Sequence, residues 1–311
     1  MPKVFIILFA AALIVAACCS VSFRWIPGDR EQNTFPILQV LVKDNSAETT
    51  NPTQVPVTEP TETAPPATQA PELTPEEEIL KLSNDVITYG PGTAENGKVP
   101  PYAPDAQARY GQYDAHFLED AKGVIYLTFD CGYEYYSDGQ SVTGMILDTL
   151  KEKNVKVIFF VTGSYVEKNP ELVQRMLDEG HALGNHSADH RQMPQLTLEE
   201  MEDAIGDLHD AVKAQFGYSM KFFRPPEGAF SLRSLAATQY LGYETVHWSF
   251  AYADWNTADQ PDPESAKEKI LSGHHDGAIY LLHAVSTTNA QVLGDVIDGL
   301  RDMGYRLDLL K

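Results

Sequence analysis

Cysteine and basic residues are scarce in this sequence. Three cysteines occur in 311 residues, and because Cys18 and Cys19 lie near the N-terminus, Cys131 has no partner for a disulfide within a folded domain. Lys and Arg number 23 against 44 Asp and Glu, which gives a net charge of -21. A chain this acidic repels phosphate backbones, and no glycine-rich phosphate loop of the P-loop type is present. Nucleic acid is therefore not an expected partner.

The first 24 residues predict a targeting or anchoring segment. Lys3 precedes an uncharged, apolar run that Arg24 closes. Val15-Ala16-Ala17-Cys18 resembles a bacterial lipobox, in which Cys18 becomes lipidated after cleavage, whereas the length of the run also suits an uncleaved membrane helix. A plain cleaved signal peptide is the third alternative. All three place the rest of the chain outside the cytoplasm, and the first two anchor it to the cell membrane.

The composition divides the chain after this segment into four parts. Residues 25–45 are a short segment of uncertain structure, and residues 46–76 form a linker rich in Pro, Thr and Glu. Such a linker cannot bury a core, so we expect an extended, disordered spacer between the membrane and a domain. Residues 77–119 are expected to wrap around the folded domain of residues 120–311. Nothing in the pattern points to an oligomer, and a monomer is expected.

Strands and helices alternate along the folded domain. Apolar runs predict strands at Val124–Phe129, Val155–Val161, Ala182–Asn185, Lys221–Phe223, Glu244–Trp248, Ala278–Leu282 and Arg306–Leu309. Helices are predicted between them, near residues 141–153, 170–179, 197–216, 231–241, 263–272 and 289–303. This alternation predicts an α/β fold, with a parallel sheet covered by helices and either open or closed into a barrel. Seven units in about 190 residues favour a barrel smaller than the eight-unit type.

Two of the predicted strands end in groups that can bind a metal. Asp130 and Cys131 follow the strand over 124–129, one a potential base and the other a potential thiolate. His186 and His190 are four residues apart, which on a helical turn places both imidazoles on one face. Together with Cys131 they offer one sulfur and two nitrogens, the ligands of a catalytic zinc site with an open water position. Taken singly, each has a structural reading as a capping, buried or surface residue.

Three more strands end in polar groups. Arg224 ends one strand and can pair with a carboxylate such as Asp130, which would keep that carboxylate ionised. Asp254 lies among aromatic residues, and His283 follows the buried strand over 278–282. A structural ion pair, a helix cap and a core histidine are the alternatives for each alone. Because the carboxyl ends of parallel strands converge on one pocket, a shared site explains these groups together.

The order of these segments is similar to that of a known family. Thr128-Phe129-Asp130-Cys131, His186-Ser187-x-x-His190, Arg224-Pro225-Pro226, Asp254-Trp255 and Leu281-Leu282-His283 resemble the five motifs of the polysaccharide deacetylases (NodB homology, carbohydrate esterase family 4). The resemblance covers about residues 120–311. Around these motifs, Thr-Phe-Asp-x-Gly-Tyr-Glu, Arg-Pro-Pro-x-Gly-x-Phe-Ser and Leu-Leu-His-x-Val-Ser resemble the δ-lactam-biosynthetic (muramic acid) de-N-acetylases, which act on peptidoglycan.

The resemblance implies a distorted (β/α)7 barrel and a metal-assisted hydrolysis that removes acetyl from an N-acetyl sugar. It assigns the general base to Asp130, the general acid to His283, the tuning of the base to Arg224 and the orientation of the acid to Asp254. It assigns metal ligation to His186 and His190, and Cys131 stands where most of the family has a second Asp ligand. With Cys131 as the third ligand, its soft thiolate makes zinc the expected divalent metal. Substrate contacts are assigned to Trp255 as a groove wall, the backbone N–H of Glu227 at the oxyanion, Tyr133 and Pro225.

The expected substrate is N-acetylmuramic acid of peptidoglycan. The first alternative is an N-acetylglucosamine or chitooligosaccharide deacetylase, because removal of the acetyl group requires the same groups in each case. The second alternative is a glycan-binding module without catalysis, in which the departure at Cys131 has emptied the site. The presence of Asp130, Arg224, Asp254 and His283 argues against that reading, because binding alone does not need a matched acid and base.

Overall fold

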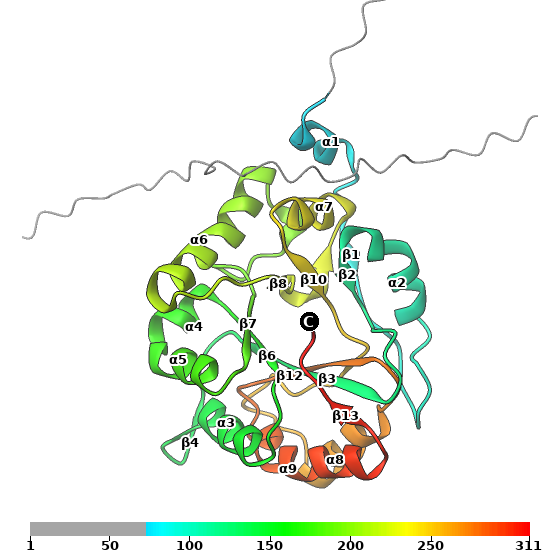
Figure 1. Ribbon diagram of the computed structural model, residues 1–311, viewed down its shortest axis with the longest axis vertical. Coiled ribbons are helices and arrows are strands. Elements are labelled where there is room, and N and C mark those ends of the chain that lie inside the picture. Colours follow the sequence, from blue (N-terminus) through cyan, green and yellow to red (C-terminus); the bar gives the residue numbers. More distant parts are fainter. Residues whose placement is uncertain (1–72) are drawn as a thin grey trace, which may run out of the picture. The chain divides into compact units, whose positions relative to one another are not determined.

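The computed structural model describes residues 73–311, in which parallel strands stand around a centre and helices surround them (Figure 1). The main sheet has the order β11-β12-β3-β6-β7-β8-β10-β2, with β13 beside β3, and every pair in it is parallel. Its strands are β2 (Ala115–His116), β3 (Val124–Cys131), β6 (Ile158–Val161), β7 (Ala182–Asn185), β8 (Phe222–Phe223), β10 (Glu244–Val246), β11 (Phe250–Ala251), β12 (Ala278–His283) and β13 (Arg306–Leu307).

Short antiparallel pairs and the helices complete the described part of the chain. The pairs join β1 (Ile87–Thr88) to β9 (Ala229–Phe230), and β4 (Tyr136–Ser137) to β5 (Gln140–Ser141). The helices are α1 (Pro75–Lys81), α2 (Ala103–Tyr110), α3 (Val142–Glu152), α4 (Gly163–Lys168), α5 (Pro170–Asp178), α6 (Leu198–Phe216), α7 (Leu232–Tyr240), α8 (Pro263–Ser272) and α9 (Thr287–Asp302).

The predicted parallel α/β sheet with surrounding helices is confirmed, and of the two alternatives, an open or a closed barrel, the structure has the open one. The sheet runs from β11 at one end to β2 at the other, and within residues 73–311 no backbone pairing joins these two strands. The strand β2 was missed because it comes from the segment expected to wrap the domain, and it joins the sheet beside β10.

The predicted anchor over residues 1–24, the segment 25–45 and the linker up to residue 72 lie outside the described residues. Among the helices of residues 73–311, none combines the length and the apolar composition that crossing a bilayer demands.

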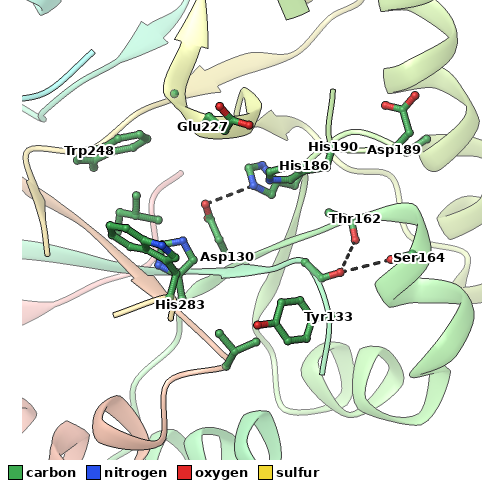
Figure 2. A pocket seen from close by; sticks show the side chains of 16 residues that line it. Asp130, Tyr133, Thr162, Ser164, His186, Asp189, His190, Glu227, Trp248 and His283 are labelled. Atoms are coloured by element: carbon green, nitrogen blue, oxygen red, sulfur yellow. Dashed lines mark hydrogen bonds and ion pairs between the residues drawn. The ribbon is translucent and has the colours of Figure 1, made fainter. Parts of the chain in front are cut away.

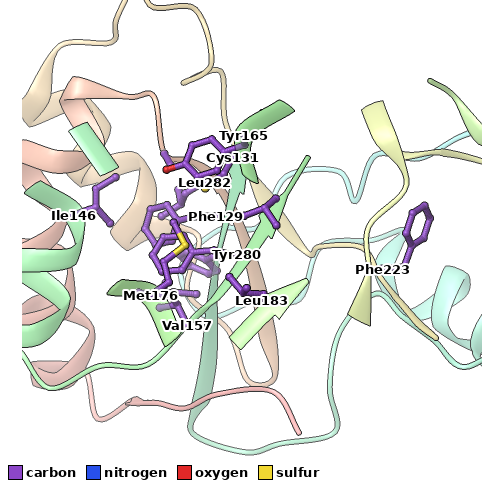
Figure 3. Packing of buried hydrophobic residues seen from close by; sticks show 14 of the residues in the cluster. Phe129, Cys131, Ile146, Val157, Tyr165, Met176, Leu183, Phe223, Tyr280 and Leu282 are labelled. Atoms are coloured by element: carbon purple, nitrogen blue, oxygen red, sulfur yellow. The ribbon is translucent and has the colours of Figure 1, made fainter. Parts of the chain in front are cut away.

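Side chains of the main sheet alternate between two cores. On β3, Ile125, Leu127, Phe129 and Cys131 belong to the large cluster between sheet and helices, part of which Figure 3 shows. The opposite face belongs to a smaller inner cluster of Ile158, Phe160, Ala182, Phe222, Val246, Ile279 and Leu310. The chain ends near the centre of the ring (Figure 1), where Leu310 is almost completely buried. Because successive side chains of a strand point to opposite faces, this alternation decides which side chain at the end of each strand reaches the inner side of the sheet.

Gly184 lies on the inner side of β7, where it leaves room for Phe160. A Cβ atom at this position would stand 2.3 Å from Cδ1 of the Phe160 ring, which also packs on Arg224, whose Cζ is 4.1 Å from the ring centroid. We predict that Gly184→Ala lowers the free energy of unfolding by about 1–3 kcal/mol, as overpacked cores do. Urea denaturation measures this change.

Gly206→Ala is the matched control. Gly206 lies within α6, and nothing stands within 4 Å of a Cβ atom built there. Removing a helical glycine should raise stability by about 0.5–1 kcal/mol. Equal effects of the two substitutions would contradict the close packing of Gly184 on Phe160.

Candidate active site

Asp130 and Arg224 form a buried ion pair at the carboxyl end of β3. Arg224 Nη1 donates to Asp130 Oδ1 over 2.8 Å, and the arginine side chain is completely buried. Its remaining groups donate to backbone carbonyls, Nε to Val246 at 3.0 Å and Nη2 to His247 at 3.1 Å. Burial raises the pKa of Asp130, but Arg224 and two histidines outweigh it and hold that pKa below its ordinary value. The predicted pairing is confirmed, and it leaves Oδ2 of Asp130 on the side of the cavity and of His186.

His186 follows β7 and faces the same carboxylate. Its Nε2 lies 3.4 Å from Asp130 Oδ2, and a dashed line marks this contact in Figure 2. Its Nδ1 lies 2.8 Å from the carbonyl oxygen of Arg224, and since a carbonyl only accepts, Nδ1 carries the proton and Nε2 keeps its lone pair. Burial lowers the pKa of His186 to about 4. The side chain is therefore neutral near pH 7, the state in which imidazole binds a metal.

His190 reaches His186 through a loop instead of the predicted helical turn. Ser187 and His190 both have left-handed backbone conformations, with φ of 64° and 60°. Asn185 Oδ1 accepts from the Ser187 N–H at 2.8 Å, and Ser187 Oγ accepts from the His190 N–H at 2.9 Å, which holds the loop. The two imidazole rings are nonetheless neighbours, with centroids 4.9 Å apart. The sequence predicted this proximity correctly and its backbone geometry wrongly.

The structure contradicts the prediction that Cys131 binds the metal. The strand β3 continues through Cys131, so Asp130 and Cys131 point to opposite faces of the sheet. Cys131 is completely buried in the outer core near Tyr165 (Figure 3), and it does not line the cavity. Burial first, and then the charges of Glu134 and Asp130, raise the pKa of its thiol well above the ordinary value. Because its thiol is neutral and buried away from the cavity, Cys131 is a residue of the core and not a metal ligand.

His283 and Asp254 form a second pair on the other side of the cavity. Asp254 Oδ1 lies 2.7 Å from His283 Nδ1, and Oδ2 accepts from the His283 backbone N–H at 2.8 Å. Asp254 is completely buried, and the His283 side chain is 25% exposed. Burial lowers the pKa of His283, but the hydrogen bond and charge of Asp254, aided by Asp130, raise it overall above its ordinary value. This arrangement favours the imidazolium.

One cavity of about 710 Å³ collects these groups. Its lining includes seven of the residues predicted from the sequence: Asp130, Tyr133, His186, His190, Glu227, Trp255 and His283. Arg224 and Asp254 stand behind the wall and contact the lining residues. Pro225 is buried and does not line the cavity, which contradicts its assignment as a substrate contact. Most of the residues that the sequence predicted for the site therefore line this cavity.

The structure adds wall residues to which the sequence assigned no role in the site. They include Thr162, Ser164, Asp189 and Leu281. Leu281 lies two residues before His283 on β12, so the period of two could have identified it. Thr162 and Ser164 follow β6, a strand whose end carries no acid or base in the sequence. Trp255 is 56% exposed, and its ring centroid lies 6.0 Å from that of His283.

Glu227 lies at the mouth of the cavity in a left-handed conformation, with φ of 56°. Gln192 Nε2 donates to its Oε2 at 2.6 Å, which fixes the carboxylate at the rim. Gly228 follows, also with positive φ, and a Cβ atom there would stand 2.5 Å from Trp248. A non-glycine residue held in this region marks strain that functional sites often contain. The predicted role of the Glu227 N–H at an oxyanion stays a prediction.

The donors present fit a divalent cation held by two imidazoles. His186 Nε2 is unprotonated and lies beside His190 and near Asp130 Oδ2, whereas within residues 73–311 no three His, Cys, Asp or Glu side chains form a ready set of metal ligands. Two imidazoles with positions open to water and substrate suit a catalytic site better than a structural one. The thiolate argument for zinc falls with Cys131, and zinc stays a prediction that rests on the imidazoles.

We predict that Cys131→Ala leaves the metal content unchanged. The substitution removes only core packing, so we expect a loss of stability of about 1 kcal/mol, the centre of the distribution for single substitutions. His190→Ala should lower metal affinity by more than the roughly 10- to 100-fold typical of outer-shell partners. Metal analysis after equilibrium dialysis measures the metal content of both variants. If Cys131→Ala loses the metal and His190→Ala keeps it, the assignment of the metal to the histidines is refuted.

Comparisons with known proteins agree with this geometry. A family model described as polysaccharide deacetylase matches residues 118–246. Over 226 residues the chain is 38% identical to the peptidoglycan-N-acetylmuramic acid deacetylase PdaA of Bacillus subtilis, which covers 72% of this chain and 84% of that protein. The chain belongs to the polysaccharide deacetylase family. It is therefore a hydrolase of the class that the motifs predicted.

Solved structures support the same membership. The structure of Bacillus subtilis PdaA, a family 4 carbohydrate esterase, aligns with a TM-score of 0.69 and 36% identity, over 73% of this chain and 96% of that one. A family 4 carbohydrate esterase from Bacillus anthracis aligns with a TM-score of 0.58 and 36% identity, over 73% and 95%. A peptidoglycan-N-acetylglucosamine deacetylase PgdA of Listeria monocytogenes is 39% identical over 181 residues, which are 58% of this chain but 36% of that protein.

Proposed function

We propose that this polysaccharide deacetylase removes N-acetyl groups from peptidoglycan, at N-acetylmuramic acid. The observation that carries the proposal is that one cavity holds a carboxylate whose pKa is lowered and a histidine whose pKa is raised. Arg224 keeps Asp130 charged, and Asp254 favours the charged form of His283. Hydrolysis of an amide needs a base for the attacking water and an acid for the leaving nitrogen. The choice of muramic acid is supported by the relative from Bacillus subtilis.

The chemistry of the side chains follows from their positions. Asp130 accepts the proton of the attacking water, because Arg224 holds it as a carboxylate whose Oδ2 lies on the side of the cavity. His283 donates a proton to the amide nitrogen as the C–N bond breaks, so that acetate and a free amine leave. A divalent metal held by His186 and His190 would polarise the acetyl carbonyl and acidify water when bound. The family resemblance supports a further role for the Glu227 N–H, donation to the oxygen on which negative charge develops.

The charge of the cavity favours a second candidate, deacetylation of N-acetylglucosamine. The described lining contains no Lys or Arg, and Asp189 and Glu227 are both part of it. Asp189 is paired with Arg191, whereas Glu227 contacts the neutral Gln192. Muramic acid carries a lactyl carboxylate that glucosamine lacks, and that carboxylate would meet no basic partner in this wall. An uncharged N-acetyl sugar fits this wall without such a cost.

Acetate release from three glycans separates the candidates. The substrates are intact peptidoglycan, peptidoglycan without stem peptides, and chitooligosaccharides, each with added zinc, cobalt or manganese. Mass spectrometry of the digested glycan then reports which sugar has lost acetyl. Loss from muramic acid supports the proposal, and loss confined to glucosamine refutes it in favour of the second candidate. No acetate from any of the three would leave only glycan binding.

We also propose that the enzyme works outside the cytoplasm, attached to the membrane. This follows from the predicted anchor in the first 24 residues and from the location of peptidoglycan. Cell fractionation of the Cys18→Ala variant tests it, because a lipid anchor at Cys18 requires the thiol. Membrane attachment that survives this substitution would support the transmembrane helix, and secretion of the unaltered protein would refute both anchors.

A further inference from the structure

The carboxylate of Asp254 is held by more than the histidine it orients. Asn289 Nδ2 donates to Asp254 Oδ2 at 2.6 Å and lies 3.2 Å from the His283 carbonyl oxygen. The two side chains are almost completely buried, at 0% exposure for Asp254 and 1% for Asn289. Oδ2 therefore accepts from Asn289 Nδ2 and from the His283 backbone N–H, which leaves Oδ1 for His283 Nδ1. Asn289 fixes which oxygen faces the imidazole.

The orientation of the Asn289 amide is itself determined. Because the Asp254 carboxylate and the His283 carbonyl oxygen only accept, Nδ2 must face them, and Asn289 Oδ1 then accepts from the hydroxyl of Tyr252. A flipped amide would place two acceptors against each other at Asp254 and would turn the Tyr252 hydroxyl from a donor into an acceptor. The three groups thus form a directed chain from the Tyr252 hydroxyl through the Asn289 amide to Asp254 and the His283 ring.

The start of α9 holds Asn289 in this place. Ser286 caps the helix by accepting from the Asn289 backbone N–H at 3.1 Å, and its own hydroxyl donates to Gln260 Oε1 at 2.7 Å. Gln260 Nε2 donates to the Asp254 carbonyl oxygen at 3.0 Å. The Asp254 carboxylate lies at the first turn of α9, where the positive end of the helix dipole stabilises an anion. These hydrogen bonds therefore hold the start of α9, the loop that contains Gln260 and the end of β12 together around Asp254.

From this arrangement we propose that Asn289 is a positioning residue for the proton donor His283, and that Tyr252 acts through it. The proposal rests on the proposed deacetylation only for its kinetic consequence. Asn289 touches neither the cavity nor the reacting atoms, since the described lining omits it. Its effect on the reaction passes through the contact between Asp254 Oδ1 and His283 Nδ1.

The charged groups near His283 predict how the loss of Asn289 changes the pKa of this histidine. Asp254 and Asp130 favour its imidazolium, whereas burial and Arg224 disfavour it. Tyr252 is neutral near pH 7, because burial raises its pKa well above the ordinary value. Without Asn289 the carboxylate of Asp254 keeps only the His283 backbone N–H at Oδ2, so its position against the ring is less fixed and the largest favourable contribution weakens. The basic limb of the pH–activity profile should then move to lower pH.

The test compares Asn289→Leu, Tyr252→Phe and the double variant in the full-length chain. We expect Asn289→Leu to lower kcat for acetate release by about 10- to 100-fold with little change in KM, as misplaced groups do. Tyr252→Phe should act in the same direction and less strongly. Without the Tyr252 hydroxyl the Asn289 amide is in the flipped orientation only part of the time, and for the rest it still donates to Asp254. In the background of Asn289→Leu, Tyr252→Phe should have no further effect on kcat.

Tyr280→Phe is the matched control. Tyr280 lies on β12, the strand of His283, and its buried hydroxyl donates to the Ile270 carbonyl oxygen at 3.0 Å. This substitution also removes a buried tyrosine hydroxyl, but one without a link to Asp254. It should lower the Tm by a similar amount and leave kcat and the basic limb as in the unaltered protein.

An NMR titration of His283 keeps this test independent of the substrate. With selectively labelled histidine, we expect a lower midpoint in Asn289→Leu and Tyr252→Phe than in the unaltered protein and in Tyr280→Phe. An unchanged midpoint and basic limb in both variants would overturn the proposal, even where stability falls. Additive effects of Tyr252→Phe and Asn289→Leu would overturn the role of Tyr252. If no glycan releases acetate, the proposed function fails, and the titration still decides the role of Asn289.

Discussion

Replacing Asp130 with Asn is expected to lower kcat for acetate release by about 10²- to 10⁴-fold, the contribution that general acid–base catalysis typically makes. Asparagine keeps the shape of the side chain and can still accept from Arg224, but it cannot take a proton from water. Binding of the glycan depends on the cavity wall, so KM should change little. Steady-state kinetics on the preferred glycan measure both constants.

The same substitution tests the energetics of the buried pair. Arg224 is completely buried and has Asp130 as its ionic partner, so the neutral amide leaves the guanidinium charge without a counter-ion. Breaking a buried pair in this way costs about 3–5 kcal/mol. The free energy of unfolding, measured by urea denaturation, should fall by an amount in this range.

Asp148→Asn is the matched control for this prediction. Asp148 also pairs with an arginine, Arg175, but its side chain is 74% exposed, and the pair lies on the surface. Such pairs contribute about 0–1 kcal/mol, and this one is remote from the cavity. A loss of stability as large as that of Asp130→Asn, or full activity of Asp130→Asn, would contradict the roles assigned to the buried pair.

The order of strands and helices could be predicted because it depends on local patterns. Apolar runs ended by turn residues identified β3, β6, β7 and β12, and Thr197 caps α6 as its sequence pattern indicates. The strands β2 and β11 were not predicted. They are strands because the neighbouring backbone pairs with them, which is a long-range effect. Whether the ring is open or closed therefore could not be decided from the sequence.

The prediction for Cys131 was wrong because the strand β3 was predicted to end too early. Ending β3 at Phe129 would let Asp130 and Cys131 leave the sheet together. The strand continues for two more residues, and the alternation of faces then sends Cys131 into the outer core. By contrast, Asp130, Arg224 and His283 were predicted together because each follows a strand whose apolar pattern is clear. Asn289 gave no such signal, because its importance comes from the fold bringing α9 against Asp254.

The second large effect is expected at His283. His283→Gln should lower kcat by about 10²- to 10⁴-fold, because glutamine can donate a hydrogen bond but cannot deliver a proton to the leaving amine. The residual activity should also lose its basic limb, since the group that titrates there has gone. His209→Gln is the control, because His209 pairs with Tyr243 and does not line the cavity. Its pH–activity profile should match that of the unaltered protein.

The sign of the pH dependence follows from the pair with Asp254. The net effect of its surroundings raises the pKa of His283 above the ordinary value of 6.5, so the imidazolium persists to higher pH. Activity that requires this form is present below the raised pKa and falls as the pH increases through it. The basic limb of kcat should therefore lie above pH 6.5, and Asp254→Asn should move it down, because the amide lacks the charge that favours the imidazolium. A profile measured from pH 5 to 10 decides the matter: a basic limb that stays in place in Asp254→Asn would assign the proton donor to another group.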